Sequence, residues 1–172
     1  MRTVPGRRFL AISRPGFSLL ELLIYVAVLS LVTVALSGIF ATINQARARA
    51  EARAEVDSIL RFAMERIETD LRQASAVSDP PSAGAQSSIL SMTLAGPTVT
   101  YEVVDGQLRR NAEPITPPTI TVTNVTFTRL ENKNTTLDRT VVSIQTVLTQ
   151  QYSTANPEYQ YAQSKISTTS LR

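Results

Sequence analysis

Glu21 is the first residue whose type and surroundings need a chemical explanation. It is the only charged residue in the 24 positions from 17 to 40, which read FSLLELLIYVAVLSLVTVALSGIF. A carboxylate deep in a membrane helix costs about 2.5–3.5 kcal/mol on insertion scales, and less near an interface. Glu21 can lie near the interface and reach water, or it can pair with a positive group inside an assembly of helices. The residues alone leave both interpretations open.

Residue types that are missing limit the chemistry of the rest of the chain. The sequence contains no Cys and no His, which excludes disulfides, thiolate nucleophiles, zinc sites built on these residues and a Ser-His-Asp triad. It also has no phosphate loop, calcium loop or catalytic pair. We therefore predict no catalytic residue, no metal site and no cofactor. Arg109 and Arg110 offer an anion site, although adjacent arginines are more often a solvated pair.

The segment that carries Glu21 is long enough to cross a membrane. At about 1.5 Å per residue, its helical length is about 36 Å, against about 30 Å for the hydrocarbon core of a bilayer. A buried helix of a soluble protein is a poor alternative, because 172 residues can hardly surround so long an apolar helix. A signal peptide has an apolar region of roughly 7–15 residues and a small-x-small site just after it. Here the run is longer, and Ala46-Arg47-Ala48 lies well beyond its end.

The distribution of charge predicts how this transmembrane helix is oriented. Four arginines precede the apolar run, where there is no acid: Arg2, Arg7, Arg8 and Arg14. Basic residues tend to stay on the cytoplasmic side, so we expect a cytoplasmic N-terminus and most of the chain outside the cytoplasm. A second basic cluster weakens the asymmetry, and nearby acids dilute it; these residues are Arg47, Arg49 and Arg53, with Glu51, Glu55 and Asp57.

The same count removes the case for nucleic-acid binding. The chain has 17 Lys and Arg against 14 Asp and Glu, a formal net charge of +3, and a pI of about 9.6. Without the four arginines of the first 16 residues, 13 basic residues face 14 acidic ones. The basic pI therefore reflects the segment before the membrane helix, and we expect no direct nucleic-acid partner.

The residues at the start of the apolar run resemble a known processing signal. Arg14-Pro15-Gly16-Phe17-Ser18-Leu19-Leu20-Glu21 is similar to the cleavage site of type IV pilins and type II secretion pseudopilins. In that family a short basic leader ends in Gly, the first mature residue is Phe, and the fifth mature residue is Glu. All three positions match, at Gly16, Phe17 and Glu21. The pattern is weak alone, but it is specific when it follows a basic leader and opens a long apolar run.

The resemblance implies a role for each matching residue. A membrane aspartyl peptidase would cut after Gly16, where the missing side chain lets the backbone approach closely in extended form. The new amine of Phe17 would be N-methylated, and the membrane helix would be retained. In a filament, Glu21 would pair with the Phe17 amine of a neighbouring subunit, because opposite charges attract strongly in a low dielectric. The implied partners are other pilin or pseudopilin subunits, the prepilin peptidase/methyltransferase, the inner-membrane assembly platform and membrane lipid.

The helix is predicted to continue beyond the membrane over residues 41–78. No Pro or Gly interrupts this segment, which is rich in Ala, Arg and Glu. Apolar residues recur at spacings of three and four and form a one-sided stripe: Val56, Leu60, Ala63, Ile67, Leu71 and Ala74. A coiled-coil partner is one use of such a stripe, but we favour a single covering sheet, because the rest of the chain is strand-like. Asp79-Pro80-Pro81 is predicted to end the helix.

Residues 79–172 are rich in Thr, Val, Ile and Ser and predict an antiparallel sheet. Asp105-Gly106 suits a tight hairpin turn, and a slip in the alternation near Asn124 indicates a bulge. Residues 131–136 read as a turn, and Tyr152, Tyr159 and Tyr161 as the cover of a sheet edge. The predicted strands are 88–94, 98–104, 107–111, 119–130, 140–149 and 165–171.

Taken together, the sequence predicts an α+β protein with a long N-terminal helix packed on a C-terminal antiparallel sheet, as in pilins. Its segments are a leader (1–16), a transmembrane helix (17–40), an amphipathic helix (41–78) and a β-rich domain (79–172). Residues 101–110 are similar to a stretch of minor pseudopilin J and PilW-like minor pilins. The expected function is that of a minor pilin or pseudopilin, in the cytoplasmic membrane and then in a periplasmic or cell-surface filament.

Two alternatives come from other functional classes. The first is an uncleaved single-pass anchor that presents a periplasmic β-domain for binding or sensing. The second is a membrane-tethered enzyme, which the absence of His and Cys disfavours. Neither alternative needs cleavage after Gly16, so the state of the N-terminus separates them from the filament subunit.

Overall fold

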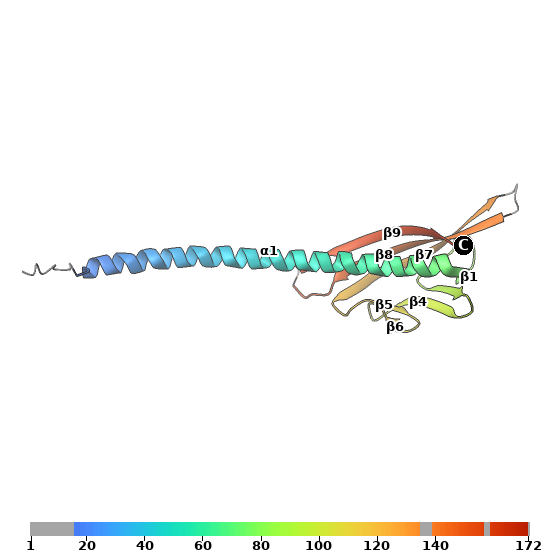
Figure 1. The fold of residues 1–172 in the computed structure, drawn as a ribbon, viewed down its shortest axis with the longest axis horizontal. Coiled ribbons are helices and arrows are strands. Elements are labelled where there is room, and N and C mark those ends of the chain that lie inside the picture. Colours follow the sequence, from blue (N-terminus) through green and yellow to red (C-terminus); the bar gives the residue numbers. More distant parts are fainter. Residues whose placement is uncertain (1–15, 135–138, 157–158, 172) are drawn as a thin grey trace, which may run out of the picture. The chain divides into compact units, whose positions relative to one another are not determined.

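The computed structural model describes residues 16–134, 139–156 and 159–171. One long helix, α1 (Leu19–Gln73), precedes all the strands of the described chain. These strands are β1 (Ala74–Asp79), β2 (Gln86–Ser87), β3 (Leu90–Leu94), β4 (Thr98–Val104), β5 (Gln107–Arg110), β6 (Glu113–Pro114), β7 (Ile120–Asn134), β8 (Arg139–Tyr152) and β9 (Ala162–Ser170). The predicted α+β class is confirmed, with the helix packed on antiparallel strands (Figure 1).

The chain divides into two compact units, Met1–Asn44 and Gln45–Arg172. The second unit holds the C-terminal part of α1 and every described strand. Its strands form two antiparallel sheets, with the order β1-β3-β4-β5-β6 in one and β2-β7-β8-β9 in the other. The prediction of a single sheet is therefore wrong. Two prolines, Pro117 and Pro118, interrupt the chain between β6 and β7, and β7 pairs with β2 and β8 instead.

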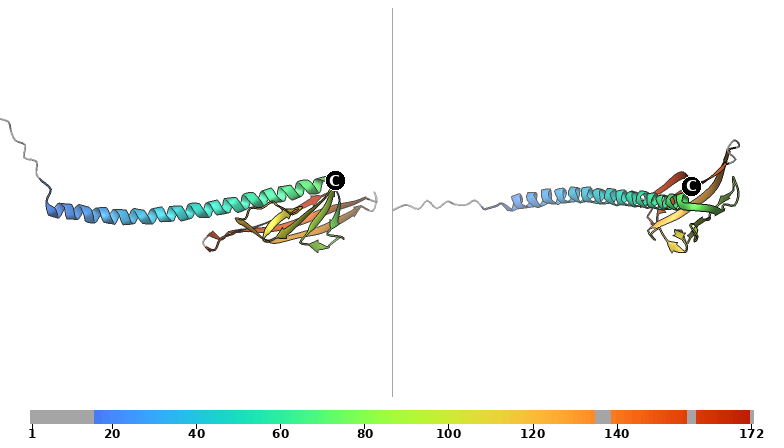
Figure 2. Two further views of the ribbon diagram at one scale, coloured as in Figure 1. Left: turned by 90° about the horizontal axis from the view of Figure 1, so that it is seen from below. Right: turned by 45° about the vertical axis from the view of Figure 1, so that its right-hand side comes forward.

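Both sheets share one hydrophobic core with the C-terminal part of α1. All six residues of the predicted stripe are buried, which confirms the stripe and shows that the chain's own sheets cover it. The helix contributes Leu60, Ala63, Met64, Ile67 and Leu71 to the core, and the sheets contribute residues such as Met92, Tyr101, Leu108, Phe127, Ile144 and Leu148. Figure 2 shows the strands crossing along one side of this part of the helix. A coiled-coil partner is not needed to cover the stripe.

The helix ends at Gln73, five residues before the predicted boundary at 78. Residues 74–79 form β1 instead and pair with β3. The hydroxyls of Ser75 and Ser78 donate to the carbonyl oxygens of Thr93 and Ser91 on β3. Because Ala74 and Val77 are buried in this pairing, tertiary contacts override the local helix propensity that the sequence shows.

The hairpins follow the turn chemistry of the sequence, but the last three strands, β7, β8 and β9, are longer than predicted. Asp105 and Gly106 both have positive φ (53° and 74°), as a tight hairpin between β4 and β5 requires. The expected bulge is present as a register shift between Val122 and Asn124. Residues 131–134 belong to β7 rather than to a turn, and the rest of that predicted turn, 135–136, lies outside the described residues. Residues 131–134 are polar, but they continue β7 because they pair with β8.

Candidate functional site

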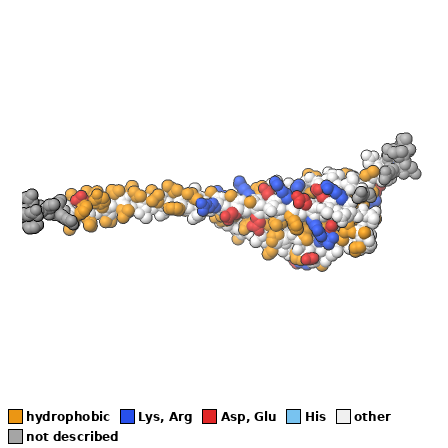
Figure 3. Space-filling view, in the orientation of Figure 1, with side chains coloured by type: hydrophobic (Ala, Val, Ile, Leu, Met, Phe, Trp, Pro, Cys, Tyr) orange, Lys and Arg blue, Asp and Glu red, His pale blue; other side chains and the backbone are white. Residues whose placement is uncertain are grey.

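The first unit presents an apolar helix surface with nothing covering it in the described chain. Large apolar side chains from Phe17 to Ile43 are exposed, at 73% for Phe17 and 42% for Ile43. Among the described residues, this is the helix that is long and apolar enough to cross a membrane. Figure 3 shows hydrophobic side chains over the N-terminal part of α1, whereas basic and acidic side chains are interspersed along its C-terminal part.

Four hydroxyl side chains within this apolar surface are satisfied by their own helix. The hydroxyls of Ser30, Thr33 and Ser37 donate to the backbone carbonyl four residues earlier, at 2.7–2.8 Å. Thr42 makes the same contact with Gly38 at 3.0 Å. Such back-bonding removes the need for water, because each hydroxyl donor is satisfied within the helix. This part of α1 therefore suits an apolar environment.

Glu21 is the only charged residue from position 17 to position 40. It lies in the first turn of α1, and its carboxylate has no hydrogen bond or ion pair to any residue that the structure describes. Phe17 lies just before the helix, and its ring meets the ring of Tyr25 edge to face, with centroids 6.2 Å apart. Gly16 has no atom within 4 Å of the position that a Cβ would occupy. The three predicted site residues therefore lie together at the start of the helix, with Gly16 accessible and Glu21 unpaired.

The second unit holds its own carboxylate in a different way. Asp70, which is 5% exposed, accepts hydrogen bonds from the Tyr101 hydroxyl and from Arg110 Nε, both at 2.7 Å to the same oxygen. Burial, together with the hydrogen bond to Asp70, raises the pKa of Tyr101 well above its usual range. The bond to Asp70 also raises the pKa of Arg110. Both donors thus keep their protons near neutral pH, and the network ties α1 to β4 and β5 rather than offering a proton.

The Asp70–Tyr101–Arg110 network was not predicted from the sequence. Arg110 was interpreted as half of a solvated pair, which is wrong, because it bonds to a buried carboxylate. Arg109 lies 3.6 Å from the exposed carboxylate of Asp105. A signal was present in the sequence: Asp70 follows Ile67 by three residues and therefore falls on the apolar stripe of the helix. A charge on such a stripe indicates a buried partner.

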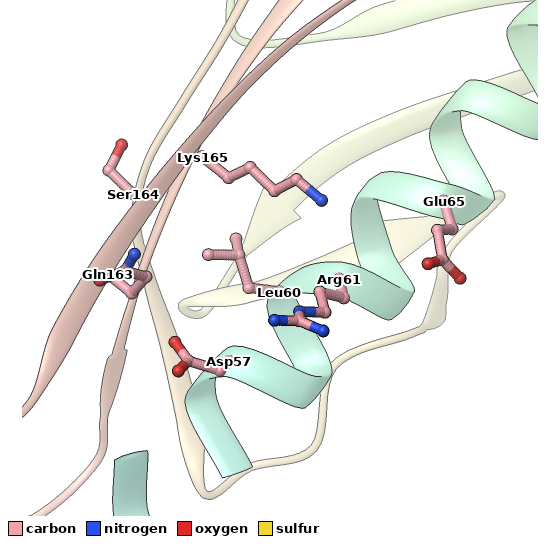
Figure 4. Close-up of a pocket in the computed structure, with 7 residues that line it drawn as sticks. All are labelled: Asp57, Leu60, Arg61, Glu65, Gln163, Ser164 and Lys165. Atoms are coloured by element: carbon pink, nitrogen blue, oxygen red, sulfur yellow. The ribbon is translucent and has the colours of Figure 1, made fainter. Parts of the chain in front are cut away.

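A surface cleft of about 450 Å³ lies between α1 and β9 (Figure 4). Lys165 extends from β9 toward the helix, and Leu60 lies between the two walls. The charged residues around the cleft are two acids and two bases, namely Asp57, Glu65, Arg61 and Lys165. Within the described residues, no group of three or more acidic side chains is placed to hold a metal ion. The balanced charge gives the cleft no preference for an anion or a cation.

Comparisons with protein-family models, curated proteins and solved structures give no match for this chain. Cleavage after Gly16, methylation of Phe17 and pairing of Glu21 therefore stay predictions. Two structural facts bear on these predictions. The apolar surface is uncovered in the described chain, and the carboxylate of Glu21 has no partner among the described residues.

Proposed function

We propose that the chain is a minor pilin or pseudopilin, a structural subunit of a type IV pilus, a type II secretion pseudopilus or a competence filament. It spans the cytoplasmic membrane once, with its N-terminus in the cytoplasm. The prepilin peptidase cuts it after Gly16 and the new N-terminus at Phe17 is methylated. The subunit then passes from the membrane, through the assembly platform, into a filament in the periplasm or at the cell surface. Its role is structural, and we propose no enzymatic activity.

The unpartnered carboxylate of Glu21 is the observation that carries this proposal. The hydroxyls of Ser30, Thr33, Ser37 and Thr42 are satisfied within the helix, so lipid or other helices can cover these positions at little polar cost. Neither lipid tails nor apolar helix surfaces stabilise the carboxylate of Glu21, which needs a cation as its partner. An α-amine at Phe17 of a neighbouring subunit supplies such a cation, and its attraction is strong away from water. A filament of these helices therefore satisfies both the apolar surface and the acid.

Mass spectrometry of the N-terminus tests the proposal directly. The membrane and filament fractions of cells with an active prepilin peptidase are digested, and the N-terminal peptide is identified. We expect a peptide that starts at N-methyl-Phe17. The matched variant Gly16→Val should keep its leader, because a β-branched side chain hinders close approach of a protease to the backbone. An intact Met1 in the unaltered chain would overturn the proposal and support the uncleaved anchor with a periplasmic domain.

Substitution of Glu21 tests the assembly step separately. Glu21→Ala should be cut and methylated normally but should enter filaments about tenfold less or worse, since a charge pair in a low dielectric is worth more than about 1.4 kcal/mol. Glu51→Ala is the matched control, because Glu51 is an exposed acid of the same helix outside the apolar surface. The measurement is the ratio of subunit in sheared filaments to subunit in membranes. Equal ratios for both variants would remove the ion-pair role of Glu21.

A further inference from the structure

Strand β9 forms one edge of the sheet that also contains β7 and β8, because among the described strands it pairs with β8 alone. Tyr161, just before β9, accepts a backbone hydrogen bond from Tyr152 at 2.9 Å. Leu171, just after β9, donates one to Val142 at 2.9 Å. In an antiparallel pair such bonds fall on every second residue, so the odd-numbered residues of β9 bond to β8 and the even-numbered ones turn their N–H and C=O groups to the open edge. These even-numbered residues are Ala162, Ser164, Ile166, Thr168 and Ser170.

The open edge of β9 is long and regular. Exposed edges are commonly protected by Pro, by a bulge or by a very short strand. Strand β9 is nine residues long, contains no Pro and pairs with β8 without a register shift. Tyr161, one of three tyrosines predicted to cover a sheet edge, lies outside β9, and its ring centroid is 5.5 Å from the guanidinium carbon of Arg53. The edge can therefore accept an added strand.

The two faces of β9 differ in what their side chains contact. On one face, the Ser167 hydroxyl donates to the carboxylate of Glu68 on α1 at 2.5 Å, and Lys165 extends toward the helix (Figure 4). On the other face, Ser164 points away from the helix and Ile166 is 63% exposed. Successive side chains of a strand alternate between the faces of its sheet. An added strand would therefore turn every second side chain toward α1, where the charge of Lys165 disfavours an apolar partner.

Three charged residues of α1 form a row beside β9. Asp57, Arg61 and Glu65 follow one another at intervals of four residues, so they lie on one side of the helix. All three line the cleft between α1 and β9, and none has a hydrogen bond or ion pair with a residue that the structure describes. Four helical residues span about 6.0 Å, and two strand residues span about 6.7 Å. Consecutive α1-facing side chains of an added strand can therefore meet the three charges in turn.

We propose that β9 pairs with an extended segment of another protein in which every second residue follows the order basic, acidic, basic. Backbone hydrogen bonds to the open edge supply affinity, and the row on α1 selects the charge order. The order reads the same from both ends, so it fits a parallel and an antiparallel strand. Phe62, which is 53% exposed beside the row, offers an apolar contact to the rest of the partner. The inference goes beyond the proposed function and holds whether or not the chain is cut after Gly16.

Fluorescence anisotropy of labelled peptides with the full chain in detergent micelles measures this pairing. The matching peptide is as long as β9, is capped at both ends, and alternates Thr with Lys, Glu and Lys. The control peptide has the same composition in the order Lys, Lys, Glu, which places like charges opposite two of the three residues of the row in either direction. We expect the matching peptide to bind about tenfold more tightly, since two exposed charge pairs change sign.

Variants of the chain test the charge row and the open edge separately. Arg61→Glu should weaken binding of the matching peptide about fivefold and should favour a peptide with three Lys instead. Arg66→Glu is the matched control, because Arg66 is exposed on the same helix but does not line the cleft. Ile166→Pro removes one outward N–H at a place where an edge strand tolerates Pro, and should weaken binding of every peptide at least about fivefold. Ile166→Thr keeps that N–H and should change binding less than about twofold.

Four results would overturn the inference. One is equal affinity of the matching and control peptides, and another is unchanged binding by Ile166→Pro, with far-UV circular dichroism showing that this variant is folded. Absence of binding by every peptide is the third. The fourth is a dimer of the full chain that sedimentation detects and Ile166→Pro dissociates, which would assign the open edge to a second copy. None of these results bears on cleavage after Gly16, which the N-terminal peptide reports independently.

Discussion

Residues 19–43 and residues 52–71 belong to the same helix but differ in what their apolar side chains contact. In the first segment apolar side chains point in every direction and are exposed. In the second most of them form one stripe, which two sheets of the same chain bury, and Phe62 is exposed outside it. A helix that is apolar all round needs an apolar surrounding, whereas an amphipathic helix needs one apolar surface to pack on. The chain supplies the second surface itself and leaves the first to lipid or to other molecules.

The two acids Glu21 and Asp70 extend this comparison to polar groups. Each lies among apolar residues of α1, where an unpaired carboxylate is costly. Asp70 receives two donors at 2.7 Å from its own chain, and Glu21 receives none from the described residues. The first arrangement stabilises the fold, and in the second the carboxylate is exposed and has no partner among the described residues. We therefore expect substitutions in the two segments to affect different measurements.

The largest expected effect on the free energy of unfolding distinguishes the buried stripe of α1 from its exposed apolar segment. Ile67→Ala should lower the free energy of unfolding of the β-domain by about 2–5 kcal/mol, because it leaves a cavity in a fully buried site. Ile24→Ala makes the same change on the exposed segment and should leave that free energy unchanged within about 0.5 kcal/mol. Urea unfolding of the full chain in detergent, followed by the near-ultraviolet circular dichroism of the tyrosines, measures both. A large effect of Ile24→Ala would show that the two segments unfold together.

The next largest effect on the free energy of unfolding distinguishes Asp70 from Glu21. Asp70→Ala should cost about 3 kcal/mol of domain stability, since it leaves the buried Tyr101 hydroxyl and the Arg110 guanidinium without their acceptor. This cost is at the lower end of the range for breaking a buried ion pair, because the Arg110 side chain is 26% exposed and partly solvated. Glu21→Ala should not change the unfolding of the domain at all. If Asp70→Ala were neutral, the network would not stabilise the contact between α1 and β4.

Comparison of the sequence predictions with the fold shows which kind of signal is reliable. The apolar run, the stripe from Val56 to Leu71 and the Asp105-Gly106 turn are local patterns, and all three appear in the structure as expected. Local patterns suffice there because helix period and turn geometry are set by neighbouring residues. The division of the strands into two sheets depends on which strands pair across the sequence. No local pattern specifies that pairing.

The wrong predictions also arise from contacts between residues that are distant in the sequence. Residues 74–78 have no helix-breaking residue, yet they pair with β3, because burial of Ala74 and Val77 outweighs propensity. Arg110 looked solvated because its partner, Asp70, is 40 residues away in the sequence. The candidate site differs in this respect: Gly16, Phe17 and Glu21 lie within six consecutive residues, so a sequence motif can point to them. The chemistry that we propose for them involves other molecules, which one chain does not contain.

A smaller effect concerns the pH dependence of the domain. Because burial raises the pKa of Tyr101 above its ordinary value near 10, the unfolded chain releases this proton at a lower pH than the folded chain. The contribution to stability is therefore complete below about pH 10 and is lost as pH rises toward the folded-state pKa, by at most about 1.4 kcal/mol per pH unit. Tyr101→Phe should cost about 1 kcal/mol at pH 9 and should remove this part of the decline between pH 9 and 11. Tyr152→Phe, outside the network, should keep the decline.

The smallest effect has the opposite sign and concerns a second buried polar side chain. Gln150 on β8 is fully buried, and neither its amide nitrogen nor its amide oxygen has a partner among the described residues. An unsatisfied buried amide costs about 1–3 kcal/mol, so Gln150→Met, which keeps the length of the side chain, should raise the free energy of unfolding by about 1 kcal/mol. Gln151→Met is the matched control, because Gln151 is half-buried on the other face of the strand. A loss of stability in Gln150→Met would show that the amide is satisfied in solution.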